Sequence, residues 1–240
     1  MDWSGDAVIS KGVTERAFEL ACDGRRVPGI VWTPEEAQNP TATVLIGHGG
    51  GGNKREPHIL ALARRLVRHH GIAAAAIDGP VHGDRAPTGA ELSVGERRAA
   101  MREGTVVEDT IADWKATLDA IQELPEIGIG RVGYWGLSMG TMFGLPFVAS
   151  EPRVEAAVLG LMGTGVFAGD RLSAYAAKVR CPVLFLQQLD DELIPKEASS
   201  ALFDLLATDE KQLHANAGAH AAAPPEEFDK TEAFLAHHLR

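Results

Sequence analysis

One stretch of the chain reads Val132-Gly133-Tyr134-Trp135-Gly136-Leu137-Ser138-Met139-Gly140. It opens with an apolar run typical of a buried strand, and residues 141–150 behind it are compatible with a helix. A serine between a strand and a helix, with a glycine two places to either side, suits a sharp turn that pushes the hydroxyl above a sheet. The glycines let strand and helix approach without a side-chain clash. The alternative is a glycine-rich turn whose serine faces solvent.

The bulk properties are those of one folded domain. The chain has 240 residues, of which 45% are hydrophobic, enough for a single α/β domain over residues 1–240. A net charge of −10, spread along the chain, disfavours nucleic acid and anionic membrane surfaces as partners. Cys22 and Cys181 make no disulfide framework and are expected to be small buried hydrophobes.

Targeting signals are not expected either. Residues 1–6 are acidic and lack the apolar core of a signal peptide, and no apolar run approaches the roughly 20 residues of a membrane span. A cytoplasmic protein is therefore expected. The sequence leaves the oligomeric state open, with a homodimer as one alternative.

Strands and helices alternate along the chain. A hairpin at 17–22 and 29–33 is followed by expected strands at 43–46, 72–77, 131–135, 154–159, 183–186 and 211–214. Expected helices span 56–70, 108–124, 195–207 and 225–238. This order predicts an α/β fold with a mostly parallel twisted sheet of about eight strands, covered by helices on both faces. Ligands in such sheets bind beyond the carboxyl ends of the strands.

The first strand end carries four consecutive glycines, in Gly47-His48-Gly49-Gly50-Gly51-Gly52-Asn53. Such a run costs conformational entropy, which suits a loop whose bare N–H groups must approach a ligand. The developing oxyanion of an acyl-transfer intermediate is one such ligand. A phosphate-binding loop is the rival interpretation, but the Walker pattern is absent because Lys54 is followed by Arg55. A plain flexible loop is the third.

The second strand end reads Asp78-Gly79-Pro80-Val81-His82-Gly83-Asp84-Arg85. Its glycines, proline and charges predict a structured turn, in which Asp78 and His82 stabilise the loop more plausibly than they catalyse. Arg85 is a candidate to reach the cleft and meet a substrate carboxylate.

The third strand end carries three acids, Asp190, Asp191 and Glu192. A carboxylate placed there can orient a histidine, keep it in the tautomer that accepts a serine proton, and stabilise the imidazolium that results. The alternative is an acidic cluster at a helix N-terminus, favoured by the helix dipole, and this fits Glu192 best.

The fourth strand end carries His220, in a loop of small residues before the last helix. His214, nearer the strand, is expected to be structural. The candidates then occur in the order Ser138, one of the acids at 190–192, His220, which is the nucleophile–acid–histidine order of the α/β-hydrolase fold. Each follows a predicted strand, and this agreement carries more weight than any single motif.

These motifs together resemble the dienelactone hydrolase and prolyl-oligopeptidase-like esterase branch of the α/β-hydrolases. The resemblance runs from about residue 43 to the C-terminus and rests on His48-Gly49-Gly50, residues 78–83, 136–140 and 191–195, and Gly218-Ala219-His220. It selects Asp191 as the acid, and it implies that the N–H groups of Gly50 and Met139 form an oxyanion hole. Gly51, in the same loop, is a substrate-binding candidate.

The sequence also departs from the family pattern. Gln188 and Val81 stand where glycines are usual. The nucleophile is serine, whereas dienelactone hydrolases proper use cysteine, so dienelactone itself is not the expected substrate.

No long cap domain is inserted, and two segments are candidates to cover the site. Residues 86–105 form a short lid-like segment with an amphipathic piece at 93–102, or an ordinary surface loop. Residues 160–178 hold Leu161, Met162, Val166 and Phe167, which suit either an acyl pocket or core packing. Met162 and Phe167 are taken as substrate-binding candidates.

The expected function is hydrolysis of a small carboxylic ester through an acyl-enzyme, with no metal or organic cofactor needed. Thioesterase, lactonase, amidase or peptidase and acyltransferase chemistry remain alternatives on the same site. A non-catalytic hydrolase-fold binding protein is the alternative of a different class.

Overall fold

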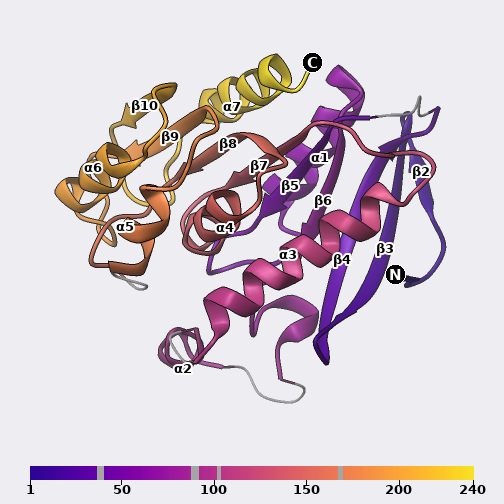
Figure 1. The fold of residues 1–240 in the computed structure, drawn as a ribbon, viewed down its shortest axis with the longest axis horizontal. Helices are drawn as coiled ribbons and strands as arrows, with labels where there is room; N and C mark the ends of the chain where they lie inside the picture. Colours follow the sequence, from indigo (N-terminus) through magenta and orange to yellow (C-terminus); the bar gives the residue numbers. More distant parts are fainter. Residues whose placement is uncertain (37–40, 88–91, 102–103, 167–169) are drawn as a thin grey trace.

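A single mixed sheet organises the chain. The computed structural model describes residues 1–36, 41–87, 92–101, 104–166 and 170–240, and within these its ten strands form one sheet (Figure 1). The strand order is β1-β3-β4-β6-β5-β7-β8-β9-β10, with β2 paired to β3. The strands are β1 Asp2–Trp3, β2 Val8–Ser10, β3 Val13–Cys22, β4 Arg25–Pro34, β5 Thr43–Gly47, β6 Ala73–Ile77, β7 Val132–Gly136, β8 Val154–Gly160, β9 Val183–Gln188 and β10 Lys211–Asn216.

The sheet has an antiparallel side and a parallel side. Strands β1 to β4 pair antiparallel, and β4 joins β6 antiparallel. From β6 to β10 every pairing is parallel. All residues of β5, β6, β7 and β9 are buried, as expected for strands covered on both faces. The alanine run in β6 is therefore strand despite its helix propensity, because tertiary burial overrides local preference.

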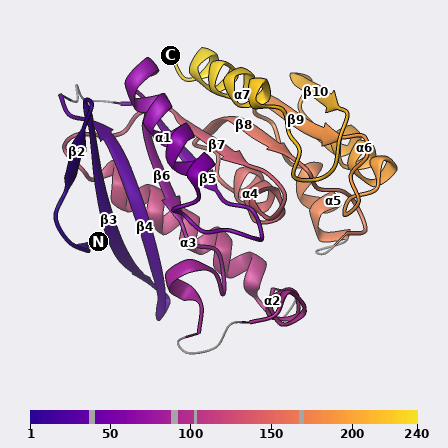
Figure 2. The same ribbon diagram turned by 180° about the vertical axis from the view of Figure 1, so that it is seen from behind.

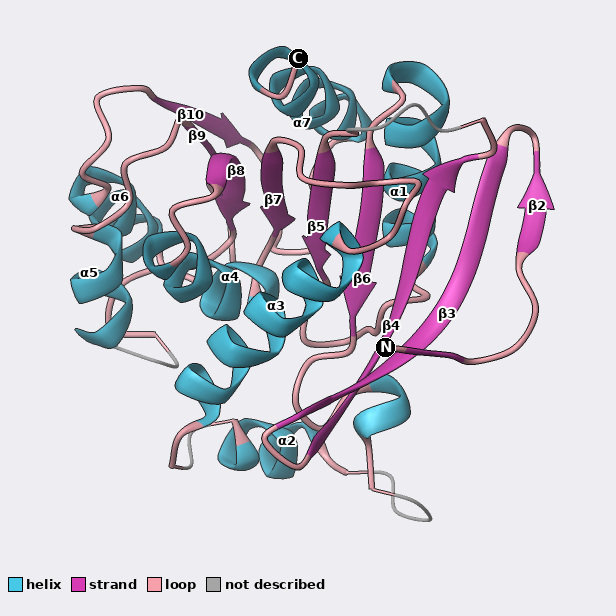
Figure 3. Cartoon of the chain, turned by 45° about the vertical axis from the view of Figure 1, so that its right-hand side comes forward, coloured by secondary structure: helices cyan, strands magenta, loops and turns pink. Residues whose placement is uncertain are grey.

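Helices cover both faces (Figures 2 and 3). Helices α1 Pro57–His70 and α7 Pro225–His238 pack on one face, around a core that includes Ile59, Leu66 and Leu235. The other face carries α3 Val106–Gln122, α4 Met139–Ser150, α5 Asp170–Ala176 and α6 Lys196–Leu205. Helix α1 ends at Gly71, whose φ of 66° suits a glycine C-cap.

The predicted α/β fold and the order of its main elements are confirmed. The sheet has ten strands rather than the expected eight or so, because the short strands β1 and β2 leave no clear pattern in the sequence. The sequence pattern also misses α5, and it gives β3 and β4 about half of their ten-residue length. Two or three residues at a sheet edge bury too little surface to leave a pattern in the sequence. No helix in the described ranges is both long and apolar enough to span a bilayer.

Candidate active site

Ser138 occupies the turn between β7 and α4. Its backbone angles, φ 58° and ψ −117°, lie in a region that a side-chain-bearing residue adopts only under strain. A Cβ at Gly136 would lie 2.8 Å from the carbonyl oxygen of Gly140, and a Cβ at Gly140 would lie 2.6 Å from that of Gly47. Both flanking glycines are therefore required by close backbone approach, and they let the turn raise the serine above the sheet.

His220 lies between the serine and an acid. Its Nε2 is 2.9 Å from Ser138 Oγ, and its Nδ1 is 2.7 Å from Asp191 Oδ2. The three residues come from loops that follow β7, β9 and β10, at one edge of the parallel half of the sheet. Strand topology thus gathers residues that are up to 82 positions apart in the sequence.

Each acid of the cluster after β9 has a different contact. The side chain of Asp191 is only 2% exposed, and its second oxygen accepts the N–H groups of Leu193 and Ile194 at 2.9 Å. Asp190 accepts the N–H of Gly218, and Glu192 accepts the N–H of His220, both at 2.9 Å. The Asp191 carboxylate therefore orients the imidazole, whereas its two neighbours fix the loop that carries it.

The alternative interpretation of Glu192 as a helix N-terminal acid is wrong. Helix α6 begins only at Lys196, and the first acid in its first turn is Glu197. The hydrogen bond from the His220 N–H instead holds the pKa of Glu192 below its ordinary value.

Gln188, which replaces the usual glycine, also supports the histidine loop. It is the last residue of β9, and its side-chain amide donates to the carbonyl oxygen of Ala219 at 3.2 Å. The other departure, Val81, adopts φ 55°, a conformation in which a glycine would be unstrained.

Gly50 and Met139 lie next to each other, beside the turn that carries Ser138. A Cβ at Gly50 would lie 3.8 Å from Met139 Cβ. Within the described part of the chain, neither backbone N–H has a hydrogen-bond acceptor. Two unpaired donors beside the serine suit a developing oxyanion.

His48, for which the sequence predicts no role, holds the glycine loop in place. Its Nε2 accepts the N–H of Gly79 at 2.8 Å, so its proton resides on Nδ1, which donates to the carbonyl oxygen of Gly49 at 2.8 Å. His82 contacts the same loop, with Nε2 3.0 Å from the carbonyl oxygen of Gly50. The Gly79 N–H fixes one tautomer of His48, because it donates to Nε2. The His-Gly pair is the feature of the sequence that could have indicated this support.

Burial lowers the pKa of His48 from 6.5 to about 4. The folded protein keeps this imidazole neutral, while the unfolded chain takes up a proton. The contribution of His48 to the free energy of unfolding is therefore lost as the pH falls through 6.5 toward 4. We expect a loss of stability on the order of 2 kcal/mol between pH 7 and pH 5 from this residue. Urea unfolding of the wild type and His48→Gln at both pH values measures it. An equal pH dependence in the two proteins would contradict the assignment.

Asp78 and Lys54 form a buried ion pair beneath the glycine loop. Lys54 Nζ lies 2.5 Å from Asp78 Oδ2, and the two side chains are 3% and 0% exposed. Asp78 also accepts the N–H groups of Lys54 and Asp84 at 3.0 and 2.8 Å. The predicted stabilising role of Asp78 agrees with these contacts, which tie the loops after β5 and β6 together.

The structure places Arg85 away from the pocket. Its guanidinium donates to Asp113 at 2.8 Å and to the carbonyl oxygen of Asp78 at 3.2 Å, and only 11% of its side chain is exposed. A cation that is already paired beneath the surface is poorly placed to meet a substrate carboxylate.

A cavity of about 650 Å³ opens over Ser138 and His220. Gly51 and Met162 line it, whereas Phe167 lies outside the described residues. Helix α2 Val94–Ala100, in the segment expected to form a lid, contributes Arg97. Lining residues that the sequence analysis did not select include His58, Trp135, Met142, Leu193 and Phe228. They come from five separate segments, so no local pattern could have grouped them.

The strand order and the serine turn define an α/β-hydrolase. The chain belongs to the dienelactone hydrolase family, whose profile matches residues 27–233. No curated protein matches the sequence. A PEG-bound complex of a novel cold-adapted esterase from an Arctic intertidal metagenomic library is 42% identical, with 100% of each chain covered and a TM-score of 0.90.

Further solved structures have the same fold. The native structure of a novel cold-adapted esterase from an Arctic intertidal metagenomic library is 39% identical, with 100% of each chain covered and a TM-score of 0.84. An acetyl xylan esterase from Paenibacillus sp. R4 shares the fold, with 19% identity over 99% of this chain and 89% of that chain, and a TM-score of 0.77. The chain is a hydrolase of the carboxylesterase type.

Proposed function

We propose that this protein is a serine hydrolase that cleaves a small carboxylic ester through an acyl-enzyme. The contact of His220 with both Ser138 Oγ and Asp191, at 2.9 and 2.7 Å, carries the proposal. These distances are within hydrogen-bond reach, as proton transfer from a nucleophile to its base requires. The site opens into a cavity of about 650 Å³, which is large enough for a small ester.

In the first half-reaction, Ser138 Oγ attacks the ester carbonyl carbon while its proton passes to His220 Nε2. Asp191 stabilises the imidazolium and holds its Nδ1–H. The carbonyl oxygen, now an oxyanion, accepts the N–H groups of Gly50 and Met139. Collapse of the intermediate breaks the bond to the alcohol, which leaves with the proton from His220.

In the second half-reaction, His220 takes a proton from water, and the hydroxide attacks the acyl-enzyme carbonyl. The same two N–H groups stabilise the second oxyanion. Collapse returns the proton to Ser138 and releases the carboxylic acid.

The cavity wall favours an apolar acyl or aryl group. Thioether, aliphatic and aromatic side chains dominate the lining, with Met142, Met162 and Phe228 among them. Burial lowers the pKa of His58, so this lining imidazole also favours its neutral form. Flexible methionines adapt to differently shaped groups.

Gly50→Pro tests the oxyanion donor. Proline removes the backbone N–H, and we expect kcat to fall by about 10²–10³-fold for a p-nitrophenyl ester. Gly50→Ala is the matched control, because its methyl group has ordinary contact distance and its N–H remains. Full turnover in a folded Gly50→Pro variant would show that Gly50 is not the donor.

Other chemistries on the same site are separated by a substrate panel of matched esters, thioesters, lactones and amides. We expect the highest kcat/KM for the esters. A chain that binds esters but turns none over would instead be a binding protein of hydrolase fold.

A further inference from the structure

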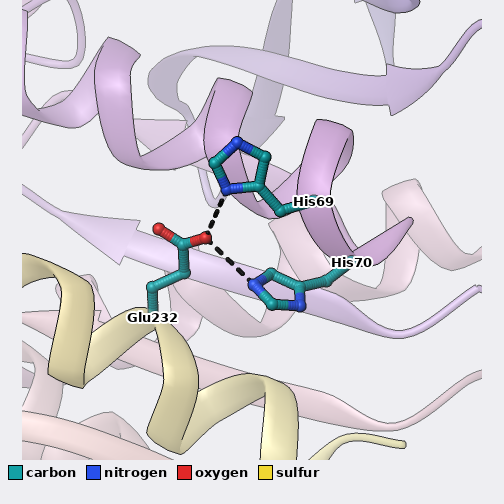
Figure 4. A group of neighbouring side chains, drawn as sticks. All are labelled: His69, His70 and Glu232. Carbon is teal, nitrogen blue, oxygen red and sulfur yellow. Dashed lines mark hydrogen bonds and ion pairs between the residues drawn. The ribbon is translucent and has the colours of Figure 1, made fainter.

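A cluster of metal-ligating side chains lies where helices α1 and α7 pack together. His69 and His70 end α1, and Glu232 faces them from α7 (Figure 4). None of the three lines the cavity over Ser138. In the described part of the chain, this is the one group of three such residues whose ligand atoms converge.

The three ligand atoms lie close together. Glu232 Oε1 lies 2.9 Å from His69 Nδ1 and 2.9 Å from His70 Nε2, and all three atoms are within 4.8 Å of one another. A tetrahedral zinc ion with bonds of about 2.0–2.1 Å needs its ligand atoms roughly 3.3 Å apart. His69 is 52% exposed, so its ring can rotate by the small amount required.

The carboxylate is held in place by a second layer of contacts. Arg65 Nε donates to Glu232 Oε2 at 2.5 Å, which leaves Oε1 directed at the two histidines. Asp229 pairs with the same guanidinium, so the positive charge of Arg65 is shared between two carboxylates. Hydrogen-bonded carboxylates of this kind orient metal ligands in known sites.

We propose that His69, His70 and Glu232 bind one divalent cation of the zinc class, which fastens α7 to α1. Two imidazole nitrogens and one carboxylate oxygen suit Zn²⁺, Co²⁺ or Ni²⁺ better than Mg²⁺ or Ca²⁺, which prefer oxygen ligands. Each imidazole binds as the neutral tautomer with its proton on the other ring nitrogen, and water completes the coordination. Arg240 lies 3.4 Å from His70 Nδ1. Because arginine is only a donor, it gives up this contact when Nδ1 carries the proton.

The test is a titration of chelator-treated full-length protein with ZnCl₂, followed by calorimetry and metal analysis. We expect one zinc per chain, and a rise in Tm of about 5–10 °C at free zinc 100 times Kd. His220→Ala, which removes the triad imidazole, should retain this zinc. Glu232→Gln and the half-exposed His69→Ala should each weaken binding by at least about 10-fold.

The matched control is the adjacent histidine pair at the end of α7, His237 and His238. Replacing both with alanine should leave zinc binding and the Tm rise intact. CoCl₂ should give the visible absorption of a tetrahedral site in wild type and not in Glu232→Gln, and MgCl₂ should not raise Tm. Equal zinc binding by wild type, Glu232→Gln and His69→Ala would overturn the proposal, as would loss of the bound zinc in His220→Ala.

Discussion

Replacing Ser138 with alanine is expected to lower kcat for ester hydrolysis by about 10⁴-fold or more. The variant loses the proposed nucleophile, and His220 then has no hydroxyl to deprotonate at 2.9 Å. The fold should persist, because the change keeps a Cβ at the strained turn and removes one oxygen. Steady-state kinetics with a p-nitrophenyl ester, alongside circular dichroism, measures both.

A fluorophosphonate probe gives an independent reading of the same serine. We expect one covalent adduct per chain in the intact-protein mass of the wild type and none in Ser138→Ala. Adduct formation in both proteins would place the reactive nucleophile elsewhere. No adduct on folded wild type would favour a binding role over catalysis.

The three neighbouring acids provide a matched series for the triad assignment. Asp191→Asn should reduce kcat by about 10⁴-fold, because an amide cannot hold the same tautomer or stabilise the imidazolium. Asp190→Asn and Glu192→Gln change side chains that contact only backbone N–H groups of the loop, and should reduce kcat far less. Equal losses in all three variants would indicate that Asp191 acts by fixing the loop alone.

Asp78→Ala is expected to lower the free energy of unfolding by about 3–5 kcal/mol. The change removes the buried 2.5 Å partner of the Lys54 ammonium, which keeps only the exposed Asp84 carboxylate at 2.6 Å, and leaves the N–H groups of Lys54 and Asp84 without an acceptor. Groups that are buried without partners carry their full desolvation cost. Urea unfolding at neutral pH measures the loss.

An exposed ion pair serves as the control for Asp78. Glu19 pairs with Arg26 at 2.5 Å, but the two side chains are 37% and 64% exposed. Exposed pairs contribute little, so Glu19→Ala should cost a small fraction of the Asp78 effect. A double variant, Lys54→Met with Asp78→Leu, should recover part of the lost stability because no buried charge remains, and the Asp84 carboxylate that loses Lys54 is 64% exposed. Equal losses for Asp78→Ala and Glu19→Ala would show that burial of the pair is not decisive.

Local patterns determined much of the fold. Buried parallel strands such as Thr43–Gly47 are continuous apolar runs, and α1 carries its apolar stripe and its terminal glycine in the sequence. The serine turn was equally visible, because its glycine pattern is local, although the close contact that requires Gly140 is with Gly47 on a neighbouring strand. Short edge strands such as Val8–Ser10 bury no face and left no such signal.

The candidate site was only partly accessible from sequence. The order of Ser138, Asp191 and His220 reflects strand topology, which the alternation of strands and helices implies. Arg85 looked equally suited to a cleft, but nothing local indicates that Asp113, 28 residues later, pairs with it. No local pattern predicts the role of His48, because its partner Gly79 follows a different strand.

The sequence by itself determined the α/β class, the serine turn and the chemical character of each strand-end loop, because these depend on neighbours within a few residues. Only the tertiary structure decided which acid reaches His220, which side chains line the cavity, and which histidines gather around Glu232. Those outcomes depend on distances between segments far apart in the chain, which strand pairing and helix packing fix and local sequence does not encode.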